Sequence, residues 1–192
     1  MDPKAFIRRS MLRNRESMPP DLVGNLSRQI VGHLLDFPIY REASSFGCFV
    51  SFKNEVETRP LLQNALKNGK SVAVPRVGSD GLMEHVRIQD LDQLRPGALG
   101  ILEPPDSEKA VSVQGLDFVA VPGLAFSLSG GRIGFGKGYY DRHLAQYDGP
   151  AVALAYGYQI VDGLPMASYD RPIDYVVTED GIRQCSQPEP EP

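Results

Sequence analysis

Apolar residues recur at helical spacing in the first third of the chain. Residues 4–15 are rich in charge, lack glycine and proline, and carry apolar side chains at intervals that predict a basic amphipathic helix. Apolar positions three and four residues apart predict a second helix, which Asp21 caps and Pro38 ends. A third helix is expected to follow a cap at Thr58 and to end at Asn68.

Short apolar runs predict strands that alternate with the helices. A further helix is expected at 139–147, and residues 90–105 are expected to be mostly loop because proline and glycine interrupt them. The alternation predicts a three-layer α/β/α domain with a mostly parallel sheet, in which the apolar run 117–121 is a central strand. We expect this single domain to span residues 1–185 and a disordered polar and proline-rich tail to span 186–192. The expected strands are 45–51, 71–75, 83–88, 117–121, 151–156 and 175–178.

Composition and charge narrow the classes of partner. The chain has 192 residues, of which 42% are hydrophobic, and a formal net charge of -4. No run of Lys or Arg is present, which argues against nucleic acid or an anionic membrane surface as the main partner. No apolar leader begins the sequence and no window approaches the ~20 apolar residues of a membrane span, so we expect a cytoplasmic protein. We also expect a monomer that acts on a small molecule.

A glycine-rich segment at 130–141 is the strongest candidate for chemistry, with five glycines in its first nine residues. Glycines allow the backbone N–H groups to approach a ligand closely, and the N-terminus of a following helix adds partial positive charge. Arg132 and Lys137 can neutralise phosphate oxygens, and Asp141 can hold a magnesium ion that accompanies them. The segment therefore predicts a phosphate-binding loop.

Two known phosphate motifs do not fit this segment. Gly138 stands where a P-loop requires Ser or Thr, and the glycines at 134, 136 and 138 follow GxGxG rather than the dinucleotide pattern GxGxxG. A surface loop whose glycines only make turns is the alternative. Lys4 and Arg8 are four residues apart on the first predicted helix, a spacing that fits a shared binding role. A solvated basic face would give the same spacing, and Arg9, Arg13 and Arg15 on the same helix show that positive charge there is not selective.

Longer motifs resemble one family. Residues 121–126 read VPGLAF and residues 132–141 read RIGFGKGYYD, and together they resemble the signature of the 5-formyltetrahydrofolate cyclo-ligase family. The similarity extends to KxxxR at 4–8, SxxxExET at 51–58, VPR at 74–76 and DxxxTE at 174–179, so it covers nearly all of the chain except the tail. It implies an α/β fold and an ATP- and magnesium-dependent conversion of 5-formyltetrahydrofolate to 5,10-methenyltetrahydrofolate. Two positions depart from the family pattern, Phe135 and Tyr169.

The resemblance assigns roles to individual residues. It implies folate contacts at Val50, Glu55 and Tyr140, with a substrate that can carry a polyglutamate chain. It implies magnesium ligands at Asp141 and Asp174, with a neighbouring aspartate as the alternative to Asp174. The ATP-binding positions implied are Lys4, Arg8, Arg132, Gly134, Gly136, Lys137, Gly138, Tyr139 and Tyr140.

The implied reaction needs positive charge but no covalent nucleophile. Transfer of the γ-phosphoryl group to the formyl oxygen makes that oxygen a leaving group, N10 then closes the ring, and ADP and phosphate are released. Arg132 and Lys137 would stabilise the moving phosphoryl group. Because Glu55 and the glycine-rich segment each follow a predicted strand, we expect both to line one cleft. The alternatives are a sugar-phosphate isomerase or CoA-transferase-like enzyme and a non-catalytic folate- or nucleotide-binding module.

Overall fold

An eight-stranded sheet organises the computed structural model, which describes residues 3–78, 80–97, 100–165 and 171–186. The helices are α1 (Pro3–Glu16), α2 (Pro20–Asp36), α3 (Pro38–Glu42), α4 (Arg59–Lys67) and α5 (Tyr139–Leu144). The sheet strands are β1 (Ser45–Cys48), β2 (Ser71–Val77), β3 (Met83–Ile88), β6 (Ala110–Val111), β7 (Phe118–Val121), β10 (Ala151–Leu154), β11 (Tyr175–Thr178) and β12 (Gly181–Gln184). Two small hairpins pair β4 (Arg95–Pro96) with β5 (Leu102–Glu103), and β8 (Ala125–Phe126) with β9 (Arg132–Ile133).

The sheet is parallel at its centre and antiparallel at its edges. Its strand order is β12-β11-β10-β7-β1-β2-β3-β6, and the five strands from β11 to β2 run parallel. The outer strands β12, β3 and β6 are antiparallel to their neighbours. The expected mostly parallel sheet, with the 117–121 run at its centre, is therefore confirmed.

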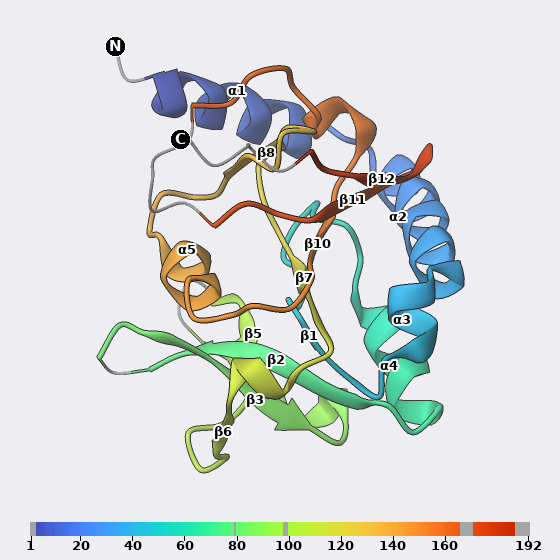
Figure 1. Ribbon diagram of the computed structural model, residues 1–192, viewed down its shortest axis with the longest axis vertical. Helices are drawn as coiled ribbons and strands as arrows, with labels where there is room; N and C mark the ends of the chain where they lie inside the picture. The colour runs from blue at the N-terminus through green and yellow to red at the C-terminus, as the bar shows by residue number, and fades with distance from the viewer. Residues whose placement is uncertain (1–2, 79, 98–99, 166–170, 187–192) are drawn as a thin grey trace.

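Alternate residues of each central strand enter two separate cores. In β7, Phe118 and Ala120 belong to the core under α2 and α4, whereas Val119 and Val121 belong to the core on the other face. The Phe46 ring of β1 stacks on the Phe118 ring at 4.9 Å, which fills the first core. Figure 1 shows α2, α3 and α4 along one side of the sheet and the short α5 on the opposite side. This arrangement is the expected three-layer α/β/α fold.

The chain changes direction across the sheet between β1 and β7. From β1 it continues to β2 on one side, whereas from β7 it continues to β10 and β11 on the other side. The loops at the carboxyl ends of β1 and β7 therefore flank the point where the strand order reverses. In open α/β sheets, ligands bind in the crevice at such a switch point. The fold thus singles out the loops after Cys48 and Val121.

Some local predictions differ from the structure. Pro19, not Asp21, occupies the cap position of α2, and Asp21 lies in the first turn, where its charge favours the helix dipole. Thr58 caps α4 by position, but its side chain makes no capping hydrogen bond. Instead, its hydroxyl donates to the Phe49 carbonyl at 2.8 Å and accepts from the Ser51 N–H at 2.9 Å. Thr58 therefore ties the loop after β1 to the start of α4.

The end of the domain lies slightly beyond its predicted position. Both the N–H and the hydroxyl of Ser186 donate to the Leu128 carbonyl, at 2.9 and 3.2 Å. Ser186 is therefore attached to the domain, while residues 187–192, the rest of the predicted tail, lie outside the described residues.

Removal of residues 187–192 is expected to change the melting temperature and activity little, because the segment contains no apolar side chain to bury. Thermal unfolding of the shortened chain measures this. The control is a chain that ends at Gln184. This chain also loses the buried Cys185 and the hydrogen bond from its N–H to the Asp174 carbonyl, so its melting temperature should be lower. Equal melting temperatures for the two truncations would contradict this placement of the boundary.

Candidate functional site

A tight loop after β1 fixes the Glu55 side chain. Lys53 adopts a left-handed conformation with φ of 53°, which turns the chain back on itself. The Glu55 N–H then donates to the Phe52 carbonyl at 3.3 Å, and the Glu55 Oε2 accepts from the Phe52 N–H at 3.0 Å. Val50, at the start of the loop, is buried. The two folate-side residues named by sequence thus lie at the carboxyl end of β1.

Arg132 connects three parts of the glycine-rich segment. It lies in β9 and is buried, and its guanidinium forms an ion pair with Asp141 in the first turn of α5. It also donates to the Pro122 carbonyl, directly after β7, at 3.4 Å, and its guanidinium carbon lies 5.5 Å from the centre of the Tyr140 ring. Within the described part of the chain, the buried Arg132 Nε has no hydrogen-bond partner. One donor of this guanidinium is therefore available to a ligand.

Positive φ angles bend the loop between β9 and α5. Gly136 has a φ of 95° and Gly138, the cap of α5, a φ of 66°, conformations that L side chains rarely adopt. Lys137 lies between them and is exposed, while Arg142 donates to the Lys137 carbonyl at 3.0 Å. Gly134 lies at the start of the loop, where its carbonyl accepts from Arg8. The two glycine turns therefore leave Lys137 exposed to solvent between them.

The first two helical tyrosines have different surroundings. The Tyr139 ring lies 5.6 Å from the Arg142 guanidinium, at the outer side of α5. The Tyr140 hydroxyl is buried and has no hydrogen-bond partner among the described residues. Burial raises the pKa of Tyr140 well above its usual value, nearby Cys48 and Glu55 raise it further, and Arg132 lowers it. The Tyr140 phenol therefore stays protonated at neutral pH, within electrostatic range of both Glu55 and Arg132.

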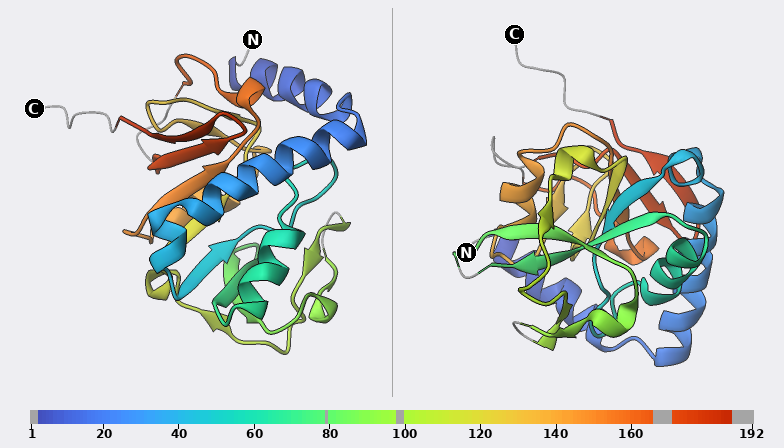
Figure 2. Two further views of the ribbon diagram at one scale, coloured as in Figure 1. Left: turned by 90° about the vertical axis from the view of Figure 1, so that its right-hand side faces the viewer. Right: turned by 90° about the horizontal axis from the view of Figure 1, so that it is seen from below.

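Helix α1 lies over the glycine-rich segment. Ile7 and Met11 pack against the core cluster that includes Ala125 and Ile133 of the β8–β9 hairpin, as the position of α1 beside β8 shows (Figures 1 and 2). On the same helix, Arg8 Nε donates to the Gly134 carbonyl at 3.1 Å. Lys4 lies one turn earlier on the same helix and is half-buried. The structure therefore brings Arg8 to the loop, as the resemblance implied.

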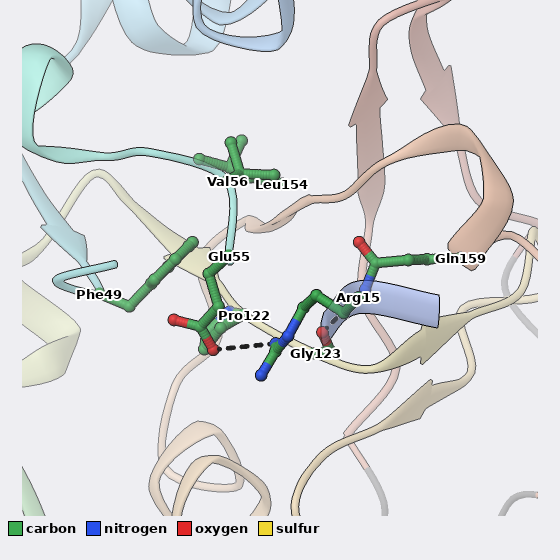
Figure 3. Close-up of a pocket in the computed structure, with 8 residues that line it drawn as sticks. All are labelled: Arg15, Phe49, Glu55, Val56, Pro122, Gly123, Leu154 and Gln159. Atoms are coloured by element: carbon green, nitrogen blue, oxygen red, sulfur yellow. Dashed lines mark hydrogen bonds and ion pairs between the residues drawn. The ribbon is translucent and has the colours of Figure 1, made fainter. Parts of the chain in front are cut away.

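Arg15 is the residue that sequence reasoning missed. Only 3% of its side chain is exposed, and its Nη1 lies 3.3 Å from Glu55 Oε1 (Figure 3). Its guanidinium carbon also lies 5.0 Å from the centre of the Phe135 ring in the glycine-rich loop. The signal was present in the spacing, because residues 4, 8 and 15 follow helical periodicity and share one face of α1. Arg15 links the loop after β1 to the glycine-rich loop.

A small cavity lies where these segments meet. It has a volume of about 10 Å³ and is bounded by the loops after β1, β7 and β10 (Figure 3). This volume suffices for about one water molecule. Its lining residues are Arg15, Phe49, Glu55, Val56, Pro122, Gly123, Leu154 and Gln159. A larger hollow of about 490 Å³ at the start of β2 includes none of the residues that the sequence nominated.

Asp174 lies at the amino end of β10, next to Ile173, whose N–H donates to the Gly130 carbonyl at the start of the glycine-rich segment at 2.9 Å. The Asp174 Oδ2 accepts from the Ala151 N–H at 2.8 Å, at the amino end of β10, and forms an ion pair with Arg171 at 3.3 Å. Asp141 instead pairs with Arg132, whose guanidinium reaches Pro122 at the carboxyl end of β7. Because β7 and β10 run parallel, the two carboxylates lie at opposite edges of the sheet.

Asp141 and Asp174 have different partners, and their shared magnesium site stays a prediction. Among the residues that the structure describes, no group of three or more His, Cys, Asp or Glu side chains is arranged to hold a metal ion. Asp180 lies in the turn between β11 and β12, and Asp170 is outside the described residues. Asp141, in the first turn of α5, is the carboxylate of the glycine-rich segment that could hold a metal ion.

Two buried histidines attach α5 to the sheet. His85 Nδ1 of β3 and His143 Nε2 of α5 are 2.7 Å apart, so one ring donates a hydrogen bond to the other. Burial lowers the pKa of His85 to about 3, and the neighbouring His143 lowers it as well. Burial also lowers the pKa of His143, although the Met83 carbonyl opposes this. Neither histidine reaches the site, but together they hold the helix that carries Tyr140 and Asp141.

The buried pair predicts loss of stability in mild acid. The folded-state pKa of His85 is below the unfolded value of 6.5, so the unfolded chain takes up the proton first and stability falls as pH decreases from 6.5 toward 3. Each pH unit in this window costs up to about 1.4 kcal/mol, or about 2 kcal/mol at pH 5. Urea unfolding between pH 8 and pH 5 measures the slope.

The control for this slope is the variant His85→Gln. Glutamine retains a polar group but cannot take up a proton, so the decline in stability below pH 6.5 should become shallower than in the parent protein. If stability changes with pH equally in the parent and the variant, groups other than His85 cause the loss of stability in acid.

Comparisons with known proteins agree with the geometry. The model of the 5-formyltetrahydrofolate cyclo-ligase family matches residues 1–179. The 5-formyltetrahydrofolate cyclo-ligase of Mus musculus is 30% identical over 168 residues, with 81% of each chain covered. The enzyme of that name from Escherichia coli K12 is 29% identical over 172 residues, which are 86% of this chain and 94% of the relative.

Solved structures carry the same fold. A 5,10-methenyltetrahydrofolate synthetase from Aquifex aeolicus superposes with a TM-score of 0.86 at 33% identity and covers 98% of this chain and 96% of its own. The synthetase from Mycoplasma pneumoniae has a TM-score of 0.76 at 23% identity, covering 93% and 99%, which supports the fold alone. The family match over residues 1–179, together with a crevice built from that family's motifs, shows that this chain belongs to the 5-formyltetrahydrofolate cyclo-ligase family.

Proposed function

We propose that the protein converts 5-formyltetrahydrofolate to 5,10-methenyltetrahydrofolate in an ATP-dependent cyclo-ligase reaction. The observation that carries the proposal is the meeting of two loops at the switch point of the sheet. Arg15 contacts both Glu55 and Phe135, and the buried Tyr140 hydroxyl lies within electrostatic range of both Glu55 and Arg132. Phosphoryl transfer between two substrates requires such direct proximity of their sites.

The charges of the glycine-rich loop fit a nucleotide triphosphate. Arg8, Arg132 and Lys137 bring three cationic side chains to this loop, and the Arg132 Nε is a buried donor that still lacks an acceptor. Bound ATP would supply the phosphoryl group that makes the formyl oxygen a leaving group. The three cations would hold the phosphate chain and stabilise negative charge as it shifts during transfer.

Magnesium fits this loop through Asp141. The Asp141 side chain is 31% exposed, so one of its oxygens is accessible beside the pair with Arg132. Magnesium in nucleotide sites often takes only one or two carboxylates and keeps phosphate oxygens and water as its other ligands. Asp174, whose Oδ2 accepts from the Ala151 N–H and pairs with Arg171, stays a prediction as the second ligand.

The folate would lie on the Glu55 side of the crevice. Glu55 accepts hydrogen bonds as a carboxylate, Val50 provides an apolar wall, and the Tyr140 hydroxyl is a donor without a protein acceptor. These groups orient the formyl oxygen toward the loop and exclude water from it. No covalent nucleophile is required, and the buried Cys48 is unsuited to that role because burial raises the pKa of its thiol.

Three finer expectations stay predictions: a cytoplasmic location, a monomeric state and acceptance of polyglutamylated folate. In the described ranges, no helix has the length and apolar character needed to cross a membrane.

The test mixes the protein with 5-formyltetrahydrofolate, ATP and magnesium, and follows both methenyl absorbance and ADP. We expect both products to appear in equal amounts and both to vanish when ATP is omitted. Binding of 5-formyltetrahydrofolate without either product would favour a non-catalytic binding module. Methenyl product formed at the same rate without ATP would overturn the ATP-dependent mechanism.

A further inference from the structure

The ion pair between Arg15 and Glu55 is almost completely buried. The side chains are 3% and 11% exposed, and the nitrogen and oxygen atoms are 3.3 Å apart. Burial of a charged pair is costly, so it persists only where surrounding groups hold it in place. Both partners here are held by their backbones and neighbours.

Backbone contacts hold both partners. The Asn54 side-chain amide donates to the Arg15 carbonyl at 2.9 Å and to the Met18 carbonyl at 3.2 Å. On the other partner, the Phe52 N–H donates to Glu55 Oε2 at 3.0 Å. The loop after β1 and the last turn of α1 are therefore joined at three points, two of them independent of the ion pair.

Arg15 also extends the connection to the glycine-rich loop. Its guanidinium carbon lies 5.0 Å from the centre of the Phe135 ring, a cation–π distance. Phe135 is flanked by Gly134 and Gly136 and is 53% exposed. The Arg15 side chain therefore contacts both Glu55 and the glycine-rich loop.

The charge of Glu55 depends on the same side chain. Burial raises the pKa of Glu55, whereas Arg15 and the Phe52 N–H lower it. The other titratable groups that face it are Tyr140 from α5 and Tyr156 after β10, which are neutral phenols because burial raises the pKa of each. Arg15 is thus the cation that opposes the effect of burial on Glu55.

We propose that Arg15 is a positioning residue for the ring-closing reaction, which holds Glu55 as an ionised, oriented hydrogen-bond acceptor for the folate at the edge of the glycine-rich loop. This inference rests on the proposed function of Glu55 in binding folate. Arg15 itself acts through Glu55 and Phe135. This role accounts for the burial of Arg15 on a helix where Arg9 and Arg13 are exposed and Arg8 is half-buried.

The test compares Arg15→Gln with Arg13→Gln, which removes the same charge from an exposed position two residues earlier. For Arg15→Gln we expect kcat/KM for 5-formyltetrahydrofolate at pH 7 to fall about 10- to 100-fold, the range for loss of a hydrogen bond to a charged group. The acid limb of its pH profile should move to higher pH, because loss of Arg15 raises the pKa of Glu55. The KM for ATP should change little, and Arg13→Gln should match the parent in all three measurements.

Conservative and double variants separate positioning from folding. Arg15→Lys retains the cation and should restore the acid limb toward the parent position, although its kcat/KM stays reduced because lysine lacks the planar fork. If Arg15→Gln does not fold, the double variant Arg15→Gln with Glu55→Gln removes the unpaired charge, and it should fold and lack the acid limb. A normal acid limb in folded Arg15→Gln, or a rise in the KM for ATP as large as the loss of kcat/KM for 5-formyltetrahydrofolate, would overturn the inference.

A measurement that does not depend on activity separates failure of this inference from failure of the proposed function. If the parent protein makes no methenyl product, the Glu55 carboxyl is titrated by carbon NMR in the parent and in Arg15→Gln. A higher Glu55 titration midpoint in the variant would support the effect of Arg15 on Glu55, while the reaction assigned to the site would be wrong. Unchanged midpoints would reject the effect of Arg15 itself.

Discussion

Replacement of Lys137 by alanine is expected to lower kcat by about 10²- to 10³-fold, the usual loss when one preorganised electrostatic contact to a transition state is removed. Lys137 is exposed between Gly136 and Gly138, so its ammonium group is directed away from the core and is available to a phosphate chain. Affinity for 5-formyltetrahydrofolate should change much less, because the folate is assigned to the Glu55 side. Steady-state kinetics and a direct folate-binding assay measure the two quantities.

The control is Lys67→Ala, which removes an exposed lysine from the end of α4. It should leave kcat unchanged, and both variants should keep the melting temperature of the parent, since neither side chain is buried. An unchanged kcat in Lys137→Ala would favour the alternative interpretation, in which the glycine-rich segment is a surface loop whose glycines only make turns.

The ion pair of Arg132 with Asp141 is expected to affect both catalysis and stability. Asp141→Ala leaves the Arg132 guanidinium buried without a counter-ion, and we expect a loss of about 2 kcal/mol in the free energy of unfolding. This value is below the ~3–5 kcal/mol of a fully buried pair because the Asp141 side chain is 31% exposed. Arg132→Met should abolish measurable turnover, because Arg132 pairs with Asp141 in the first turn of α5 and lies 5.5 Å from the centre of the Tyr140 ring.

The double variant Arg132→Met with Asp141→Leu separates the two effects. Apolar residues of similar volume often replace a buried ion pair at little cost, so stability should return toward that of the parent while activity stays absent. Urea unfolding of the parent, both single variants and the double variant gives the coupling energy. Strictly additive losses of stability would show that the two side chains do not act as a pair.

The sheet and the glycine-rich loop were predictable because their signals are local. Residues 118–121 form a short apolar run, and their burial on both faces matches that composition. β12 was not expected, because Gly181–Gln184 contains one apolar residue in four and forms a strand only through pairing with β11. The contact of His85 with His143 joins positions 58 residues apart, so only the topology reveals it.

The site was only partly predictable, for physical reasons that differ between residues. Arg15 shares its helix face with Lys4 and Arg8, but its burial depends on Glu55 and Phe135, which reach it only in the folded chain. Asp174 precedes its strand, and the amino end of a parallel strand is remote from the edge where ligands bind. The metal role of Asp174 therefore stays a prediction, and its contacts at the amino end of β10 are visible only in the folded chain.

The dependence of the site on α1 has a consequence for the order in which the chain folds during synthesis. Ile7 and Met11 pack against a cluster containing Ile133, and Arg8 donates to Gly134, 126 residues later in the chain. A 14-residue helix is only marginally stable alone, so α1 finds its permanent packing partner only after the β8–β9 hairpin, more than 100 residues later, has been made. Nascent chains that end before Ile133 therefore expose the apolar face of α1, and these are the chains for which a chaperone would be needed.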